Sequence, residues 1–144
     1  MVVNKENSCA FYASDYHLEM IILPYINKKF NENKNVYVFT QNDLEDTINT
    51  LVEKVNIDNK IKNKVLDINW KNEDENKYNN LINDKNAVVF IKGNEKYINK
   101  VNTNLNQIKE QNNLEVIDCY YLEEIGNKMP KIITEHSNII TTKC

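Results

Sequence analysis

Short apolar segments alternate with amphipathic ones along most of this 144-residue chain. An apolar run of four to six residues is typical of a buried strand, whereas apolar residues three and four apart are typical of one face of a helix. The sequence therefore predicts repeated strand–helix–strand units and a mainly parallel sheet. The expected strands cover 9–12, 36–40, 65–70, 87–91, 114–119 and 138–142.

Between these strands the helical spacing recurs at 18–30, 44–55, 78–82, 98–108 and 122–133. Helices of this length between parallel strands cover both faces of the sheet. We expect an α/β fold with five to six strands, a three-layer sandwich of the Rossmann-like kind, with 138–142 closing one edge. The segment 1–8 has no periodicity and is expected to be a flexible N-terminus, so that 9–144 form a single domain.

Local signals mark several helix ends. Asn42, with Glu45 three residues later, has the spacing of a capping box and predicts the start of the second helix. Pro24 lies inside the first apolar stripe, where it should kink the helix or mark its first turn. Gly126 is expected to stop the last helical segment and Pro130 to restart it.

Composition limits the cellular setting and the partners. Cys9, Cys119 and Cys144 are odd in number and lack the spacing of a metal site, which indicates reduced thiols in a cytoplasmic protein. No apolar stretch is long enough for a membrane span or a signal peptide. All 18 basic residues are lysine and the net charge is −3, so we expect neither direct nucleic-acid binding nor a membrane partner.

In an open α/β sheet, ligands bind at the carboxyl ends of the strands, and the first strand-to-helix junction is a common binding position. Many such proteins carry a glycine-rich phosphate loop there, but this chain has Tyr12, Ser14, Asp15 and His17 without glycine or lysine. Phosphate-loop nucleotide hydrolysis is therefore excluded. Ser14 or Asp15 is expected to cap the following helix, which still leaves amides free for a ligand.

Two further junctions face the same crevice. The second strand ends at Thr40 and is followed by Gln41, and the 87–91 strand is followed by a turn at Gly93, where Asn94 can cap a helix. We therefore predict a ligand-binding crevice at the carboxyl ends of these strands. Its predicted lining is Tyr12, Ser14, Asp15, His17, Thr40, Gln41 and Gly93, without a metal or cofactor.

Other residues invite a chemical role but have simpler explanations. Ser14 with His17, or Cys119 alone, would serve a small hydrolase or transferase, yet a lone cysteine after a buried strand is more often a core residue. His136 has the position of a helix-terminal histidine. Trp70 ends the expected third strand, where it lies in the core or lines a pocket.

Several segments together resemble the MEDS sensory domain, the DcmR-type domain of methanogens and methylotrophs. Phe11-Tyr12, then Leu23-Pro24-Tyr25-Ile26 and Val36-Tyr37-Val38, are similar to its opening, and Cys119-Tyr120 with Glu135-His136 to its closing segments. The resemblance implies a degenerate RecA-like or KaiC-like core without a phosphate loop, and a role in sensing.

We therefore expect a cytoplasmic sensory, regulatory or adaptor domain without enzymatic activity. Such a domain would act through a protein partner, a regulator or a kinase, or by self-association, and would respond to a small-molecule ligand. A small enzyme using Ser14, His17 or Cys119 is the first alternative. A structural dimerisation module is the second.

Overall fold

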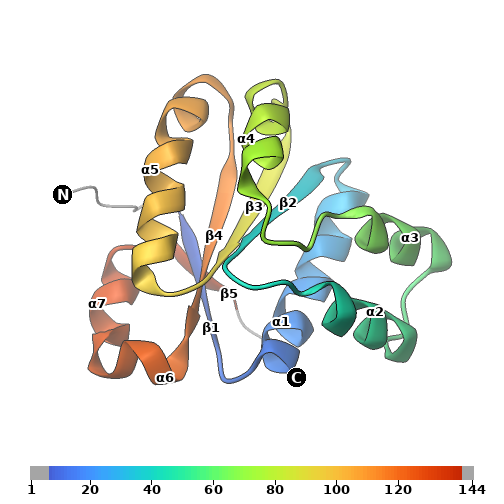
Figure 1. Ribbon diagram of the computed structural model, residues 1–144, viewed down its shortest axis with the longest axis horizontal. Coiled ribbons are helices and arrows are strands. Elements are labelled where there is room, and N and C mark those ends of the chain that lie inside the picture. The colour runs from blue at the N-terminus through green and yellow to red at the C-terminus, as the bar shows by residue number, and fades with distance from the viewer. Residues whose placement is uncertain (1–6, 141–144) are drawn as a thin grey trace.

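The computed structural model describes residues 7–140 and confirms the expected α/β architecture as a five-stranded sheet in which every pairing is parallel (Figure 1). The strands stand side by side in the order β2-β3-β4-β1-β5, so β2 and β5 form the two edges. The strands are β1 (Ser8–Tyr12), β2 (Asn35–Thr40), β3 (Ala87–Lys92), β4 (Glu115–Tyr121) and β5 (Asn138–Ile140).

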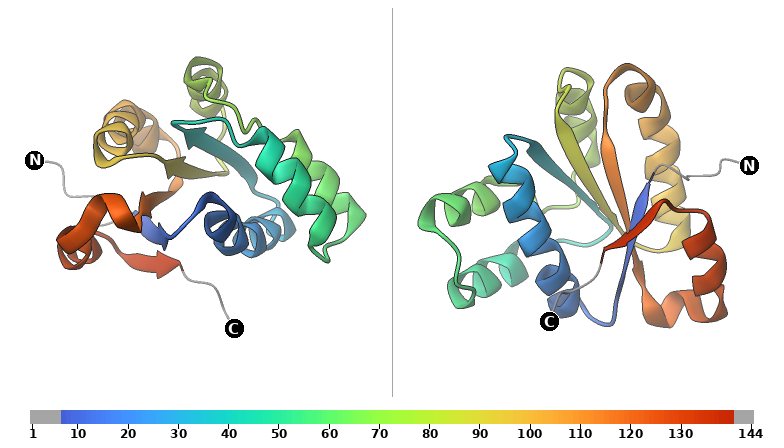
Figure 2. Two further views of the ribbon diagram at one scale, coloured as in Figure 1. Left: turned by 60° about the horizontal axis from the view of Figure 1, so that its bottom comes forward. Right: turned by 180° about the vertical axis from the view of Figure 1, so that it is seen from behind.

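Helices connect the strands and cover both faces of the sheet. Those in the first half of the chain up to residue 67 pack on one face, and those after it pack on the other (Figure 2). The first face carries α1 (Asp15–Asn31), α2 (Glu45–Lys54) and α3 (Asn59–Asp67), and the second carries α4 (Asp74–Ile82), α5 (Glu95–Gln111) and α7 (Met129–Thr134), preceded by the short α6 (Leu122–Ile125) and the 3₁₀ turn η1 (Gly126–Lys128).

The strand β3 shows how the sequence builds both layers at once. Val88 and Phe90 point into the core beneath α1, while Val89 and Ile91 point into the core beneath α5. All four side chains are buried. A strand between two helical layers needs apolar residues on both faces, which is why this segment reads as an uninterrupted apolar run.

The predicted third strand at 65–70 is wrong, because Asn59–Asp67 form the helix α3. Ile61 and Val65, four residues apart, are its buried side chains, and Leu66 is exposed. Asp58 caps the helix by accepting a hydrogen bond from the Lys60 amide at 3.0 Å. The alternation of apolar and polar residues thus came from a helix and the extended segment after it.

The expected helix ends are confirmed at four places and wrong at one. Ser14 and Asn94 cap α1 and α5, Gly126 ends α6, and Pro130 lies in the first turn of α7. Asn42 does not cap α2, since this helix begins after Leu44 without a side-chain cap. Pro24 lies in the interior of α1 rather than in its first turn.

The two ends of the described chain lie side by side. The structure begins β1 at Ser8, one residue before the expected start, and Asn7 is fully buried. The strand β5 pairs with β1 and forms the edge, as predicted, although residues 141 and 142 of the expected strand lie outside the described residues. The rest of the expected flexible N-terminus, residues 1–6, also lies outside them.

Candidate functional site: the carboxyl-end crevice

A cavity of about 420 Å³ opens at the carboxyl ends of β1, β2, β3 and β4. The strands β1 and β4 are neighbours, but the chain leaves β1 toward the α1 face and leaves β4 toward the α7 face. Such a divergence opens a crevice in which ligands of open α/β sheets bind. The residues that line this carboxyl-end crevice are Tyr12, Ala13, Ser14, Asp15, Gln41, Asn42, Lys92, Gly93, Asn94, Tyr121 and Glu124.

Five of the seven predicted site residues meet there, and two do not. The crevice is lined by Tyr12, Ser14, Asp15, Gln41 and Gly93. The Thr40 side chain is instead buried at the end of β2, where its hydroxyl donates to the Asn42 carbonyl at 2.6 Å. The His17 ring accepts the Ala13 amide hydrogen at Nδ1, at 2.8 Å.

Lys92 is the central charge of the crevice, and it was missed from the sequence. Its side chain is only 7% exposed. The ammonium lies 3.0 Å from Asp15 Oδ1, donates to Asn42 Oδ1 at 2.7 Å, and sits 5.4 Å from the centre of the Tyr12 ring. A lysine at the last position of an otherwise apolar strand was the available signal, because a buried cation requires partners.

Glu19 adds an unusual carboxyl group one helical turn below Asp15. It is fully buried, and neither carboxyl oxygen has a hydrogen-bond partner within the described residues. Burial and, to a smaller extent, the negative charge of Asp15 raise the pKa of Glu19 to about 7, against the opposing positive charge of Lys92. Glu19 therefore exchanges a proton near neutral pH beside the crevice.

Gly93 is required at the crevice by a close approach rather than by backbone conformation. Its φ is not positive, unlike that of Gly126 at +52°. A Cβ atom at Gly93 would lie 2.6 Å from Tyr97 Cδ2 and 2.9 Å from Gln41 Oε1. The same Gln41 oxygen accepts the Asn94 amide hydrogen at 2.9 Å and so connects the end of β2 to the start of α5.

The residues considered for nucleophilic catalysis are engaged otherwise. The Ser14 hydroxyl oxygen accepts the His17 backbone amide hydrogen at 3.1 Å, which is a helix cap and does not deprotonate the hydroxyl. Cys119 is 1% exposed, and burial raises its thiol pKa far above the ordinary value. A catalytic thiol needs the opposite shift, so Cys119 is a core residue.

A second polar cluster surrounds the buried Asp118 of β4, on the face of the sheet that α5 and α7 cover. Its carboxylate accepts hydrogen bonds from Asn7 at 3.2 Å and Asn102 at 3.0 Å, and contacts His136 Nε2 at 2.8 Å. The Lys109 ammonium donates to the Asn7 side-chain oxygen. His136 was expected only as a helix-terminal histidine, and Asp118 was not predicted as a site residue, because an aspartate inside a strand is typical of a solvent-facing position in an alternating pattern.

His136 joins this cluster from the segment after α7. Burial alone lowers its pKa, but the hydrogen bonds to Asp118 and to the Ile132 carbonyl, with the negative charges of Asp118 and Glu135, raise the pKa above the ordinary value. Its Nδ1 lies 2.6 Å from the Ile132 oxygen. Both ring nitrogens therefore face acceptors, and the ring, which can donate to both of them only when it is protonated, joins the end of α7 to β4.

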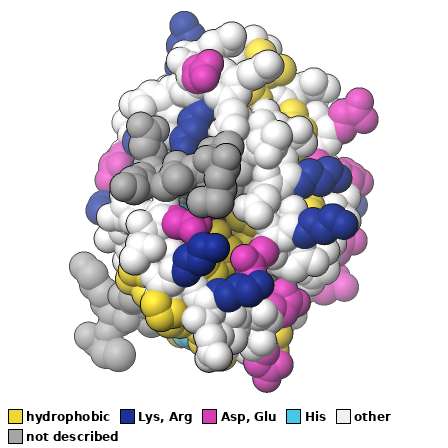
Figure 3. Space-filling view, turned by 90° about the vertical axis from the view of Figure 1, so that its left-hand side faces the viewer, with side chains coloured by type: hydrophobic (Ala, Val, Ile, Leu, Met, Phe, Trp, Pro, Cys, Tyr) yellow, Lys and Arg dark blue, Asp and Glu magenta, His cyan; other side chains and the backbone are white. Residues whose placement is uncertain are grey.

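A cavity of about 390 Å³ lies next to this cluster, between α5 and α7. Its rim carries Glu95 and Glu135 as well as Lys128 and Lys131. Figure 3 views this side of the molecule, where lysine and carboxylate side chains alternate around a small apolar area. The two negative and two positive side chains balance each other, so this surface does not select a ligand by its charge.

Comparison with known proteins adds no closer assignment: no family model, no curated protein and no solved structure matches this chain. The fold and the crevice therefore define an all-parallel α/β domain with a polar crevice at the carboxyl ends of its strands. None of the helices in residues 7–140 has the length and apolar character needed to cross a membrane.

Proposed function

We propose that this domain is a non-enzymatic sensor or adaptor that binds a small anionic ligand in the carboxyl-end crevice. The observation that carries the proposal is the buried Lys92 ammonium at the crevice, paired with Asp15 and Asn42. A fixed, desolvated cation attracts an anionic group more strongly than a solvated one. The first turns of α1 and α5, beside Ser14 and Asn94, add backbone amides to the same space.

Asp15 is the group that an incoming ligand would displace from Lys92. Its side chain is 43% exposed, whereas that of Lys92 is 7% exposed. The Asp15 carboxylate can therefore turn toward solvent while Lys92 stays in place. An incoming carboxylate or phosphate group would take over the contact with Lys92, so that ligand binding moves the first turn of α1.

The resemblance to MEDS sensory domains supports the same role. A RecA-like core without a phosphate loop would keep its crevice and lose nucleotide hydrolysis. The domain would then pass its state to a regulator or a kinase, because ligand binding in this crevice has no chemical product. The engagement of Ser14, His17 and Cys119 in capping and core packing favours binding over catalysis.

A thermal-shift screen tests the proposal with inorganic phosphate, adenine nucleotides and small dicarboxylates as probes. A ligand at 100 times its dissociation constant should add about 2.7 kcal/mol to the free energy of unfolding. The Lys92→Gln variant should lose this shift, while Lys85→Gln, on an exposed lysine away from the crevice, should retain it. A folded Lys92→Gln protein with unchanged affinity would rule out this site.

Covalent labelling separates sensing from catalysis. Serine-directed and thiol-directed probes, followed by mass spectrometry, should modify neither Ser14 nor Cys119 selectively. Rapid and selective modification of Ser14 would instead support the hydrolase or transferase alternative.

A further inference from the structure

Glu19 is a buried carboxyl group to which no side chain or backbone amide of the described chain donates a hydrogen bond. Among residues 7–140, only its two oxygens are buried side-chain atoms without a hydrogen-bond partner. The other fully buried carboxyl group, Asp118, accepts hydrogen bonds from Asn7 and Asn102. Because a buried carboxylate without donors is much less favourable than the neutral acid, the charge of Glu19 depends on the charges around it.

Two charged residues act on Glu19, Asp15 and Lys92. Asp15 lies one helical turn earlier on α1, and Lys92 ends β3. Of the other elements that pack on α1, none of β1, β2, α2 and α3 contributes a charge that shifts the pKa of Glu19 within the described residues. Tyr12 and Cys119, which lie near Lys92, are neutral because burial raises the pKa of each far above its ordinary value. One ammonium therefore serves two carboxyl groups.

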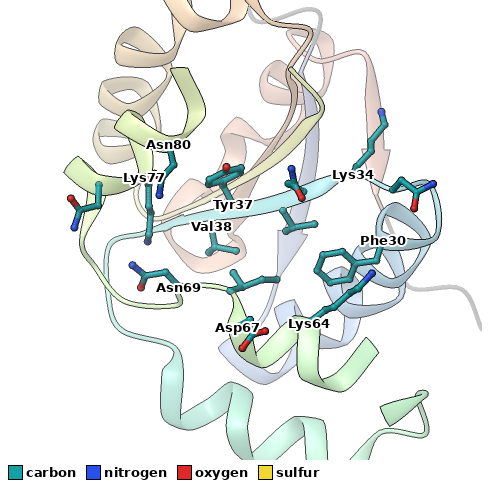
Figure 4. Close-up of a pocket in the computed structure, with 14 residues that line it drawn as sticks. Phe30, Lys34, Tyr37, Val38, Lys64, Asp67, Asn69, Lys77 and Asn80 are labelled. Atoms are coloured by element: carbon teal, nitrogen blue, oxygen red, sulfur yellow. The ribbon is translucent and has the colours of Figure 1, made fainter. Parts of the chain in front are cut away.

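The other buried lysines of the described chain have different partners. Lys29 pairs with Glu115 at 2.8 Å, and that carboxylate also accepts a hydrogen bond from Tyr25. Lys77, beside a cavity of about 550 Å³ that follows β2 (Figure 4), donates to the Lys71 carbonyl at 2.6 Å. Within residues 7–140, a buried ammonium next to a buried carboxyl group without a partner is therefore specific to the carboxyl-end crevice.

An anion bound to Lys92 would change the charge balance at Glu19. In the free domain, the positive charge of Lys92 opposes the effect of burial and favours ionised Glu19. A carboxylate or phosphate group on the ammonium would cancel part of that charge and exclude water from the crevice, and both effects favour the neutral acid. Turning Asp15 away does not reverse them, because the ligand brings at least one negative charge to the same place.

We propose that an anionic ligand enters the carboxyl-end crevice together with one proton, which passes from the solvent to the Glu19 carboxylate. The inference rests on the proposed anion site and adds its regulation by pH. The pKa of about 7 leaves Glu19 partly ionised at neutral pH in the free domain, so that a proton can be taken up. By linkage, proton and ligand strengthen each other's binding by the same factor. The domain therefore binds the anion more weakly as the pH rises.

The protonation of Glu19 in the free domain is measured without a ligand. In carbon-13 NMR spectra of protein labelled at the glutamate carboxyl carbons, one signal should titrate near pH 7. It should be missing in Glu19→Gln and unchanged in Glu53→Gln, which removes an exposed carboxyl group of α2. If Glu19 titrates at about pH 4.3, the usual value for glutamate, this inference is wrong while the anion site remains.

Calorimetric titration with oxalate and sulfate tests the coupling, because both anions stay fully ionised at neutral and alkaline pH. In buffers of different ionisation enthalpy at about pH 7.5, the natural protein and Glu53→Gln should take up about half a proton or more per bound anion, and Glu19→Gln much less. From about pH 6.5 to about pH 9, the affinity of the natural protein should fall by about fivefold or more, and that of Glu19→Gln by much less. For a probe that itself titrates, such as phosphate, the difference between the natural protein and Glu19→Gln gives the uptake.

The outcomes separate this inference from the proposed function. If no probe of the anion screen binds, the proposed function fails and this inference fails with it. If an anion binds and Lys92→Gln abolishes its binding, but the natural protein takes up no proton, the anion site stands and the inference is overturned. Full proton uptake in Glu19→Gln would also overturn it, because another group would then be the acceptor.

Discussion

At the scale of single residues, the crevice depends on how closely backbone and side chains approach at Gly93. Tyr97 packs against this residue from the first turn of α5, and its hydroxyl donates to Asp74 at 3.0 Å. The ring is therefore held at both ends and cannot easily move away from an added methyl group. This contact keeps the end of β3 close to α5 and fixes one wall of the crevice.

We predict that Gly93→Ala lowers the free energy of unfolding by about 1–3 kcal/mol, the usual cost of overpacking. The added Cβ would lie 2.6 Å from the Tyr97 ring. Urea denaturation measures the loss, and a double-mutant cycle with Tyr97→Ala identifies its source. In the Tyr97→Ala background, Gly93→Ala should lower the free energy of unfolding by much less. An equal loss in both backgrounds would show that the strain lies in the backbone.

At the scale of elements, β4 and α7 are joined through a buried ion pair, which makes their contact dependent on pH. The pKa of His136 is raised in the folded state, relative to about 6.5 in an unfolded chain. A raised pKa gives stability that is complete below about pH 6.5 and is lost as the pH rises through the folded-state value. The neutral imidazole then carries one hydrogen and can satisfy only one of Asp118 and the Ile132 carbonyl.

We predict that the difference in free energy of unfolding between the natural protein and His136→Gln is largest near pH 5.5 and shrinks toward pH 9. Urea denaturation at several pH values gives both curves. Glu19, with its pKa raised to about 7, titrates in the same range but is present in both proteins, so its effect cancels in the difference. A difference that grows with pH would contradict the assignment of charge to His136.

The sequence predicts a helix or strand correctly where the pattern of apolar residues matches the side chains that are buried in the fold. The apolar run at 87–91 predicted a buried strand. Ser14 and Asn94 are residue types that cap helices, and they predicted the starts of α1 and α5. The helix α3 was missed because Leu66, although apolar, is exposed, and this concealed the four-residue spacing of Ile61 and Val65. The error mattered, since α3 supplies one wall of the cavity of about 550 Å³ that follows β2.

The candidate site was predictable in its position but less so in its charges. Junction residues are fixed by topology, so Tyr12, Ser14 and Gln41 could be placed together before the strand order was known. Lys92 and Glu19 belong to a strand and a helix, and their roles depend on where long side chains end in space. Such contacts arise from packing between distant segments, which periodicity does not encode.

At the scale of the whole molecule, the two hydrophobic cores lie on opposite faces of one sheet and are expected to unfold together. Trp70 is buried in the core under α1, α2 and α3, where its indole nitrogen donates to the Val65 carbonyl at 2.8 Å. Leu105 of α5 is fully buried in the opposite core. Because β1, β2, β3 and β4 each contribute side chains to both cores, damage to one core should reach the other through the sheet.

We predict that Leu105→Ala lowers the free energy of unfolding by about 2–5 kcal/mol and shifts the unfolding transition seen by Trp70 fluorescence as much as the one seen by far-ultraviolet circular dichroism. Coincident transitions are the mark of a two-state domain. The control, Leu66→Ala, truncates a side chain that is 44% exposed and should shift both transitions only slightly. If Leu105→Ala shifted the circular dichroism transition and left the Trp70 transition in place, the faces would unfold separately. The carboxyl-end crevice, which draws residues from β1, β3 and β4 and from the segment after β2, would then be built on two independent units rather than on one rigid sheet.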